Sequence, residues 1–199
     1  MDLGFAYMRK KNWSNAAGQF NKKVQADSTG PPTVQTATAL INYALCMEQL
    51  QDWAKSRKAL VQALQVVPNN ILGHLNLAIT YRQMGADSLP QAKREYETVI
   101  ALIDTNKSKY KDQLGDSYKQ IAFINLVNKN WAAAEEAIAK SLEFRSRDVE
   151  LMLWHAQTLH ALGRRDDARR EYERIVKVAP KSKEAEDAKK GVDRLDLGF

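Results

Sequence analysis

The sequence repeats itself at intervals of 34, 40 or 44 residues, and this constrains the fold more than any single residue does. A small residue recurs at five places along the chain: Gly4, Ala44, Ala78, Ala122 and Ala156. Twelve positions after four of these comes a second small residue: Ala16, Ser56, Ala134 and Ala168. Sixteen positions after the same four comes a bulky one: Phe20, Leu60, Ile138 and Tyr172. After Ala78 the same residues follow two positions later, as Ala92 and Tyr96. A period of about 34 residues is typical of stacked supersecondary units.

Each unit has the pattern of two helices. In the last unit, apolar residues between Val149 and Leu162 recur with helical spacing, and Gly163 favours a helix end there. Acidic Asp166 suits the start of the next helix, which Pro180 ends. The intervening turn is short, so the two helices must be antiparallel neighbours. The sequence therefore predicts an all-α fold of antiparallel helix pairs.

We expect one domain over residues 1–199, made of about five units and a terminal helix. The predicted units are an incomplete 2–27, then 33–70, 71–106, 107–148 and 149–182. A polar helix over 183–195 would cover the last apolar face of the stack. The first copy begins at Asp2, several residues into the place where its helix would start. This suggests a piece of a longer protein, in which a signal, an anchor or another domain could lie upstream.

Composition narrows the function classes. No apolar run is long enough to span a membrane, and the N-terminus lacks a secretory signal, so we expect a cytoplasmic chain. Upstream sequence could change that expectation. The single cysteine, Cys46, lies among apolar neighbours, which predicts a buried thiol. A net charge of +6 supports solubility and biases association toward acidic partners without naming them.

Catalysis, metal binding and nucleic-acid binding are all poorly supported. No nucleophile–histidine–acid spacing and no phosphate-binding glycine loop occur, and we expect no cofactor. His155 and His160 are five residues apart, so they do not share a helix face as metal ligands would. Basic residues between 164 and 190 alternate with acids four positions away, as in Glu173 and Lys177. That pattern is typical of a solvated helix face, which leaves RNA or DNA binding as the least favoured function.

The repeat resembles that of the tetratricopeptide repeat family. The family pattern of small, small, aromatic and proline occurs as Ala156, Ala168, Tyr172 and Pro180. The resemblance implies an α-solenoid, a right-handed superhelix whose first helices line a concave groove. It also implies a non-enzymatic scaffold or adaptor that binds a protein segment in that groove.

Carrying the family pattern across gives candidate groove residues. They are Phe5, Ile41, Asn42, Leu45, Leu75, Asn76, Ile79, Arg82, Lys119, Phe123, Leu126, Leu153, Trp154 and Gln157. The middle of this set is apolar, which predicts a hydrophobic or amphipathic partner segment. The alternative is that tight superhelical curvature buries several of these side chains against the next unit.

One family binding mode is not expected. Members that grip the C-terminal carboxylate of heat-shock chaperones need lysines and an arginine around a central asparagine. Around Asn76 those sites hold Ile41, Leu45, Asp116 and Gln120. Without two cations the charge-assisted bonds to a carboxylate cannot form, so no carboxylate clamp is predicted.

Self-assembly is an alternative function. The tetrapeptide Asp2-Leu3-Gly4-Phe5 recurs as residues 196–199 at the other end of the chain. The tail of one copy could therefore stack on the first unit of another and form a head-to-tail homo-oligomer.

Overall fold

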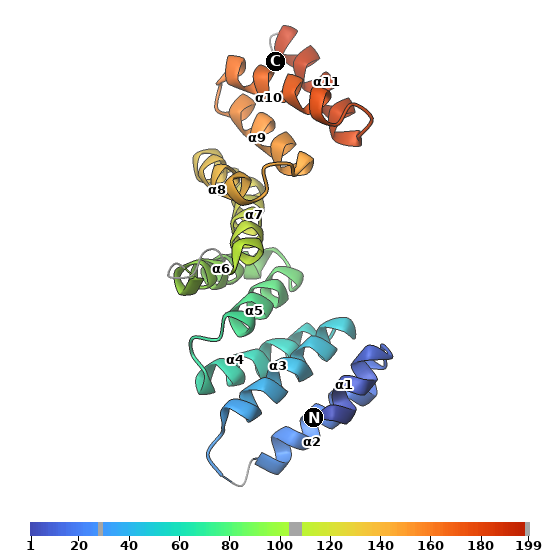
Figure 1. Cartoon of the computed structure of the whole chain (residues 1–199). Helices are drawn as coiled ribbons and strands as arrows, with labels where there is room; N and C mark the ends of the chain where they lie inside the picture. The colour runs from blue at the N-terminus through green and yellow to red at the C-terminus, as the bar shows by residue number, and fades with distance from the viewer. Residues whose placement is uncertain (28–29, 104–108, 198–199) are drawn as a thin grey trace. The chain divides into compact units, whose positions relative to one another are not determined.

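The chain is helical throughout the part that the structure describes. The computed structural model describes residues 1–27, 30–103 and 109–197, which form eleven α-helices, one short 3-10 helix and no strand (Figure 1). Residue contacts divide the chain into two compact units, Met1–Asp104 and Thr105–Phe199. The predicted all-α fold of antiparallel helix pairs is confirmed. The hand of the superhelix and the single domain over 1–199 stay predictions.

The first unit contains three helix pairs. Its helices are α1 (Asp2–Arg9), α2 (Trp13–Ala26), α3 (Val34–Gln49), α4 (Trp53–Val66), α5 (Ile71–Gln83) and α6 (Leu89–Ile103). Each helix packs against the next one along the chain. The extra residues after Ala78 form the short helix η2 (Ala86–Ser88), so the insertion lengthens a turn and leaves the pairing of α5 with α6 intact.

The second unit contains two helix pairs and a final helix. Its helices are α7 (Lys111–Val127), α8 (Trp131–Phe144), α9 (Val149–Ala161), α10 (Arg165–Val178) and α11 (Lys183–Asp196). Successive helices again pack together, and α11 contacts both α9 and α10. Ala185, Ala188 and Leu195 of α11 are buried against these helices, while its outward residues are mostly charged. A polar terminal helix therefore lies where the sequence predicts one.

The repeating small residues lie where the paired helices cross. Ala44, Ala78, Ala122 and Ala156 are completely buried, and so are the second small residues of the same pairs, such as Ser56 and Ala168. Larger side chains here would separate helix axes that normally pack about 8–10 Å apart. The bulky residues that follow are also buried; they are Phe20, Leu60, Tyr96, Ile138 and Tyr172. The small and bulky residues that recur along the sequence are therefore the residues that form the core of each helix pair.

Helix starts depend on polar caps that the sequence predicts incompletely. Asn12 and Asp52 each accept a backbone N–H of their own first turn, at 3.3 and 3.1 Å. Asn130 stands before Trp131 as Asn12 and Asp52 stand before Trp13 and Trp53, a pattern that predicts a third cap, yet its side chain makes no cap hydrogen bond, so that prediction is wrong. At α3, Thr33 and Thr36 form a reciprocal capping box.

The turns within the helix pairs need a residue with a left-handed backbone. Gly163 ends the first helix of the last pair at φ 76°, as its position predicts. Three other pairs use a long polar residue instead: Lys11 at 55°, Gln51 at 60° and Lys129 at 56°. Residues with a Cβ reach this region at a cost of roughly 1–2 kcal/mol. Packing of the flanking helices must therefore hold these turns in place.

Candidate functional site

In the first unit, the predicted binding residues lie mainly on α3 and α5. We call Ile41, Asn42, Leu45, Leu75, Asn76, Ile79 and Arg82 the α3–α5 face. Ile41 is buried at 8 % exposure, and the other apolar members, Leu45, Leu75 and Ile79, are half-buried. Asn42 donates its side-chain amide to the Thr38 carbonyl at 2.8 Å, which leaves its carbonyl oxygen available. The face therefore combines accessible apolar side chains with an amide.

Phe5, the remaining candidate of this unit, takes part in packing. Its ring lies edge-on to Phe20 with centroids 5.3 Å apart, and both contribute to the core between α1, α2 and α3. Gly4 makes this approach possible, because a Cβ there would lie 2.8 Å from the Phe20 ring. Phe5 is half-buried, so only part of its ring is accessible.

A hydroxyl–carboxyl cluster joins three helices beside the α3–α5 face. Glu48 Oε1 of α3 accepts from Thr80 Oγ1 of α5 at 2.9 Å and from Ser56 Oγ of α4 at 3.2 Å. The two hydroxyls are 3.0 Å apart. Burial raises the pKa of Glu48, although both hydrogen bonds act in the opposite direction. The repeat identifies Ser56 as a small residue of its unit, but no sequence pattern indicates that Glu48 would bond to it.

Arg82 follows Ile79 by three residues on α5 and is half-buried. Its Nε is buried and has no hydrogen-bond partner among the described residues. Arg82 also places a positive charge on this face, which favours an acidic group on a partner segment.

In the second unit, the predicted residues lie on α7 and α9. We call Lys119, Phe123, Leu126, Leu153, Trp154 and Gln157 the α7–α9 face. Phe123 and Trp154 pack with ring centroids 6.2 Å apart and a tilt of 39°. Both are half-buried, as is Leu126, whereas Gln157 is exposed and Leu153 is buried at 8 % exposure. The structure thus brings the two aromatic residues together as neighbours.

Lys119 is held by acidic residues at the start of α9. Its Nζ lies 2.8 Å from Asp148 and 2.7 Å from Glu150, and 5.4 Å from the centre of the Trp154 ring. Burial alone would lower the pKa of Lys119, but the two carboxylates raise it above its ordinary value. Lys119 therefore stays protonated with its charge balanced by the two carboxylates, and it holds Trp154 and the N-terminus of α9 in position.

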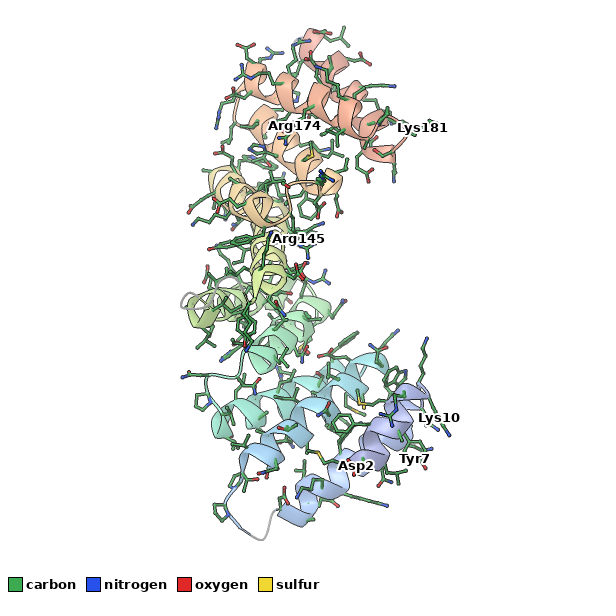
Figure 2. All side chains as sticks on the ribbon, in the orientation of Figure 1. Asp2, Tyr7, Lys10, Arg145, Arg174 and Lys181 are labelled. Carbon is green, nitrogen blue, oxygen red and sulfur yellow. The ribbon has the colours of Figure 1, made fainter. Side chains whose placement is uncertain are left out.

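Residues around Lys119 that the candidate set omits complete this arrangement. Arg145, marked in Figure 2, follows α8 and pairs with Asp116 of α7 at 2.5 Å. It also lies 4.0 Å from Asp148, which caps α9 by accepting the Leu151 N–H at 3.0 Å. The sequence indicates the capping role of Asp148, because aspartate before an apolar helical segment is a common N-cap. It does not indicate that Asp148 pairs with Lys119 of the preceding repeat.

Comparison with known sequences addresses the family. The sequence profile of the tetratricopeptide repeat matches residues 38–70 and 150–182. These ranges coincide with α3–α4 and α9–α10 and the turns that follow them. Two segments of the chain are therefore tetratricopeptide repeats. A search of curated proteins finds no match to its sequence.

Solved structures resemble this chain in fold. The crystal structure of MamA protein matches with a TM-score of 0.74 at 14 % identity, covering 91 % of this chain and 90 % of that one. A tetratricopeptide repeat protein from Parabacteroides merdae matches with a TM-score of 0.74 at 18 % identity, covering 98 % and 74 %. YrrB, described as a tetratricopeptide repeat protein with an unusual peptide-binding site, gives 0.63 at 16 % identity, covering 82 % and 76 %. At these identities the likeness concerns the fold alone.

The described part of the chain contains neither a cluster of metal-binding side chains nor a membrane-spanning helix. In the described ranges, no three His, Cys, Asp or Glu side chains are grouped so that they could hold a metal ion. Burial lowers the pKa of His155, which keeps its imidazole neutral at pH 7. Within the same ranges no helix has the length and apolarity needed to cross a bilayer. Of the repeated tetrapeptide, Gly198 and Phe199 lie outside the described residues.

Proposed function

We propose that the chain is a non-catalytic scaffold that binds hydrophobic or amphipathic protein segments at two faces, the α3–α5 face of the first unit and the α7–α9 face of the second, each taken by itself. The observation that carries this proposal is the pair Phe123 and Trp154, two large aromatic side chains in contact with each other on neighbouring first helices and only half-buried. Aromatic residues in such positions dominate the binding energy of many interfaces.

The α3–α5 face supplies a second set of anchors. Leu45, Leu75 and Ile79 are accessible enough to accept apolar side chains of a partner. Arg82 adds a half-buried cation beside them, which favours an acidic group of a partner. A partner with apolar side chains at helical or extended spacing and a carboxylate near one end fits this combination. The peptide-binding site named for YrrB is consistent with such a use of the fold.

Two of the predicted binding residues, Ile41 and Leu153, are buried. Both are 8 % exposed, so they support their neighbours and offer little surface of their own. Lys119 has two carboxylate partners, so we assign it the positioning of Trp154 and expect no direct recognition of an acidic ligand.

A displayed peptide library tests the function with the full chain as target. We expect selected peptides to carry apolar residues at i, i+3 and i+4, or at i and i+2. Phe123→Lys should weaken a peptide that binds the α7–α9 face at least about tenfold, and Ile79→Lys one that binds the α3–α5 face, since each removes a half-buried apolar anchor. Val61→Lys on α4, where Val61 is 39 % exposed and off both faces, is the matched control.

Two outcomes of this selection would contradict the proposal. Selected peptides that bind equally well to the wild type, Phe123→Lys and Ile79→Lys proteins, with helicity unchanged by circular dichroism, would refute binding at these faces. A library from which no peptide is enriched would count against the scaffold function itself.

A further inference from the structure

The turns within the three helix pairs of the first unit lie along one edge of that unit. Successive helices are antiparallel, so α1, α3 and α5 end at the same edge, whereas α2 and α4 end at the opposite one (Figure 1). We call the surface formed by residues 9–13, 50–54 and 83–88 the turn edge. None of its residues belongs to the α3–α5 face.

The first turn of this edge is basic. Arg9, Lys10 and Lys11 follow one another and are all exposed, and Lys10 is marked in Figure 2. Within the part of the chain that the structure describes, their side chains form neither an ion pair nor a hydrogen bond. Asp2, the acid of α1, is the first residue of that helix, whereas Arg9 is the last. The turn therefore carries a concentrated positive charge.

The second turn forms an apolar hollow with the end of α5. The volume of this hollow is about 600 Å³, and Leu50, Trp53 and Met84 supply its large apolar side chains. Leu50 is 45 % exposed, Met84 is 36 % exposed and Trp53 is half-buried. Asp52, the acid that lines the hollow, is already paired with Lys55 at 2.6 Å. This surface, which we call the Trp53 hollow, can therefore accept an apolar side chain.

Two residues of the turn edge hold a left-handed backbone although their side chains have no partner in the fold. Lys11 and Gln51 adopt φ 55° and 60°, and neither exposed side chain is hydrogen-bonded within the described residues. Gly163 serves the same turn of the last helix pair without a Cβ penalty. Backbone strain of this kind is often kept where a side chain has a functional task. Folding alone does not account for a lysine and a glutamine at these positions.

We propose that the turn edge of the first unit docks an acidic protein segment. Its carboxylates would meet Arg9, Lys10 and Lys11, and an apolar anchor residue would enter the Trp53 hollow. Charge complementarity assigns this occupant, because the cations of the first turn lack acidic partners and the hollow beside them is apolar. The proposal is independent of binding at the α3–α5 and α7–α9 faces.

The spacing of the turns sets the spacing within the segment. The first turn lies next to the second, because Trp13 of the first packs against the cluster that contains Met47 near the end of α3. Neighbouring turns should be about 10–12 Å apart, the diameter of a helix with its side chains. An extended chain covers this distance with about three to four residues of about 3.3 Å each. The anchor and the nearest acid should therefore be about three to five positions apart.

A protein segment fits this edge better than an anionic lipid surface does. The Trp53 hollow is a recess that can receive a projecting side chain, whereas a bilayer presents a broad, flat surface. Asp87 of η2 follows Met84 at the third turn and is exposed, so anionic headgroups spread over the whole edge would repel it.

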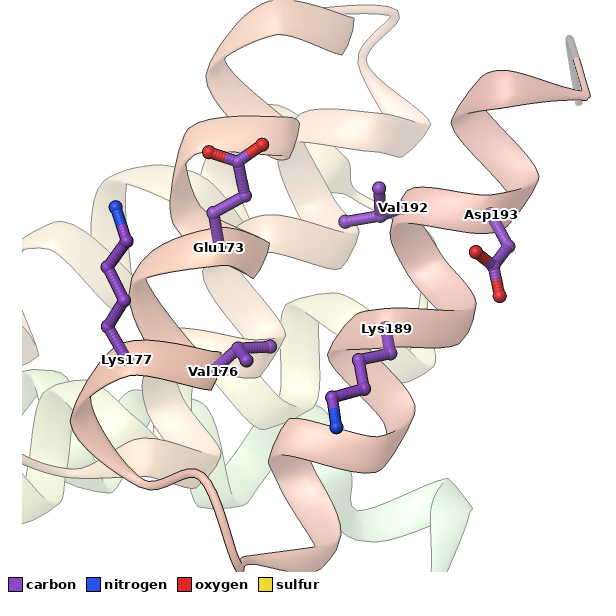
Figure 3. A pocket seen from close by; sticks show the side chains of 6 residues that line it. All are labelled: Glu173, Val176, Lys177, Lys189, Val192 and Asp193. Atoms are coloured by element: carbon purple, nitrogen blue, oxygen red, sulfur yellow. The ribbon is translucent and has the colours of Figure 1, made fainter.

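A hollow in the second unit shows what the absence of a charge preference looks like. Two acids and two lysines line the hollow between α10 and α11, together with Val176 and Val192 (Figure 3). Its charges favour neither an acidic nor a basic partner. The turn edge differs because its first turn has cations alone.

Displayed peptide libraries test the proposal with the full chain as target. Each peptide carries three fixed charged residues at one end and five random positions. We expect enrichment when the fixed residues are glutamate and none when they are lysine. Enriched peptides should carry Trp, Phe, Leu or Met about three to five positions from the nearest glutamate. Their binding should weaken between about 0.01 M and about 1 M salt, because the Debye length falls from about 30 to about 3 Å.

Substitutions locate the binding site. Lys10→Glu with Lys11→Glu should weaken a selected acidic peptide at least about tenfold, because carboxylates then meet carboxylates. Leu50→Asp, which places a charge in the Trp53 hollow, should have a similar effect. Arg57→Glu with Lys58→Glu reverses two exposed cations of α4 away from the turn edge and should leave the affinity unchanged. Circular dichroism verifies that every variant keeps its helix content.

A glycine substitution separates folding from binding. Lys11→Gly relieves the left-handed backbone, so the urea midpoint should rise while the affinity for the acidic peptide falls about two- to fivefold, the contribution of one exposed ion pair. Lys129→Gly makes the same change at φ 56° in the second unit, and it should raise the midpoint and keep the affinity. If Lys11 were merely structural, the two variants would behave alike.

Three results would overturn the proposal. Equal enrichment from the glutamate and lysine libraries, or none from either, shows that the edge selects no acidic segment. A selected peptide that binds the Lys10→Glu, Lys11→Glu variant and Leu50→Asp like the wild type binds elsewhere. Co-sedimentation of the chain with phosphatidylserine vesicles, lost in the same variants while no peptide is enriched, would assign the edge to a membrane surface.

Discussion

Gly191 offers a sharp test of how tightly the terminal helix packs. A Cβ at this position would lie 2.5, 2.6 and 2.7 Å from Cζ, Cε1 and Cε2 of Tyr172, a residue that is only 3 % exposed. Ordinary contacts begin near 3.4 Å, so Gly191→Ala requires a shift of about 1 Å (3.4 minus 2.5) in a buried ring or in α11. Overpacking of this kind costs roughly 1–3 kcal/mol.

Helix propensity acts in the other direction. Alanine is better than glycine inside a helix by about 1 kcal/mol, so the net effect of Gly191→Ala should be a destabilisation of about 1 kcal/mol. Gly18 of α2 is the matched control, because it is exposed and a Cβ there meets nothing within 4 Å. Gly18→Ala should therefore stabilise the protein by up to about 1 kcal/mol. The same substitution thus has opposite signs at two sites.

Urea denaturation followed by circular dichroism measures both changes, with an unchanged m value as the criterion for comparable transitions. Repeating Gly191→Ala in a Tyr172→Leu background should remove its penalty, because the ring that blocks the new methyl is gone. If Gly191→Ala is as stabilising as Gly18→Ala, the close contact with Tyr172 does not limit the packing of α11 and the reasoning fails.

Three further predictions concern polar groups and turns. Burial raises the pKa of Glu48, so ionisation of this carboxyl opposes folding. The unfolding free energy of the wild type should therefore rise as pH falls from the raised pKa toward 4.5. Glu48→Gln should lack this rise when urea unfolding is measured at each pH. Burial alone would raise the pKa of Asp148, but Lys119 and the Leu151 N–H lower it below 3.8, so its contribution is present above that value and is lost as pH falls further. Asp148→Asn should cost less than about 1 kcal/mol by keeping the cap, and Asp148→Ala about 1–2 kcal/mol; equal losses would mean that the cap contributes nothing. Gln51→Gly should stabilise the protein by about 0.5–1 kcal/mol, because glycine adopts the left-handed backbone at φ 60° without strain. Thermal and urea unfolding measure this change. A loss of stability would show that the Gln51 side chain contributes more than the strain costs.

The periodic features of the fold could be predicted from the sequence because each repeat solves the same packing problem. Ala156 and Tyr172 are buried for the same geometric reason as Ala44 and Leu60, so recurrence along the chain identifies them. The end of α9 was also readable, because Gly163 can adopt a left-handed backbone without a Cβ penalty.

Features that depend on neighbouring repeats could not be predicted in the same way. The bond between Glu48 and Thr80 joins residues 32 positions apart, and the pairing of Lys119 with Asp148 joins residues 29 apart. Each depends on side-chain conformations that no local pattern specifies. Lys11, Gln51 and Lys129 likewise adopt left-handed turns without the glycine that would signal them.

For the candidate binding faces, the pattern identified which helix surface to consider but not how much of each side chain is accessible. Ile41 and Leu45 occupy similar positions on α3, yet one is buried and the other is half-buried. The difference arises from the packing of the adjacent helices, and binding at these faces stays a prediction.

Burial of the single cysteine makes the rate of its modification a measure of how often the first unit opens. Cys46 is completely buried, and burial raises its pKa to about 11, so its thiol is shielded and protonated in the folded chain. A thiol-modifying reagent can reach it only when α3 separates from its surroundings, and the rate of modification then follows the opening equilibrium. The second unit has no cysteine and cannot contribute to that signal. Timed alkylation of the unaltered protein would therefore record the opening of one half of the molecule while the other half is silent.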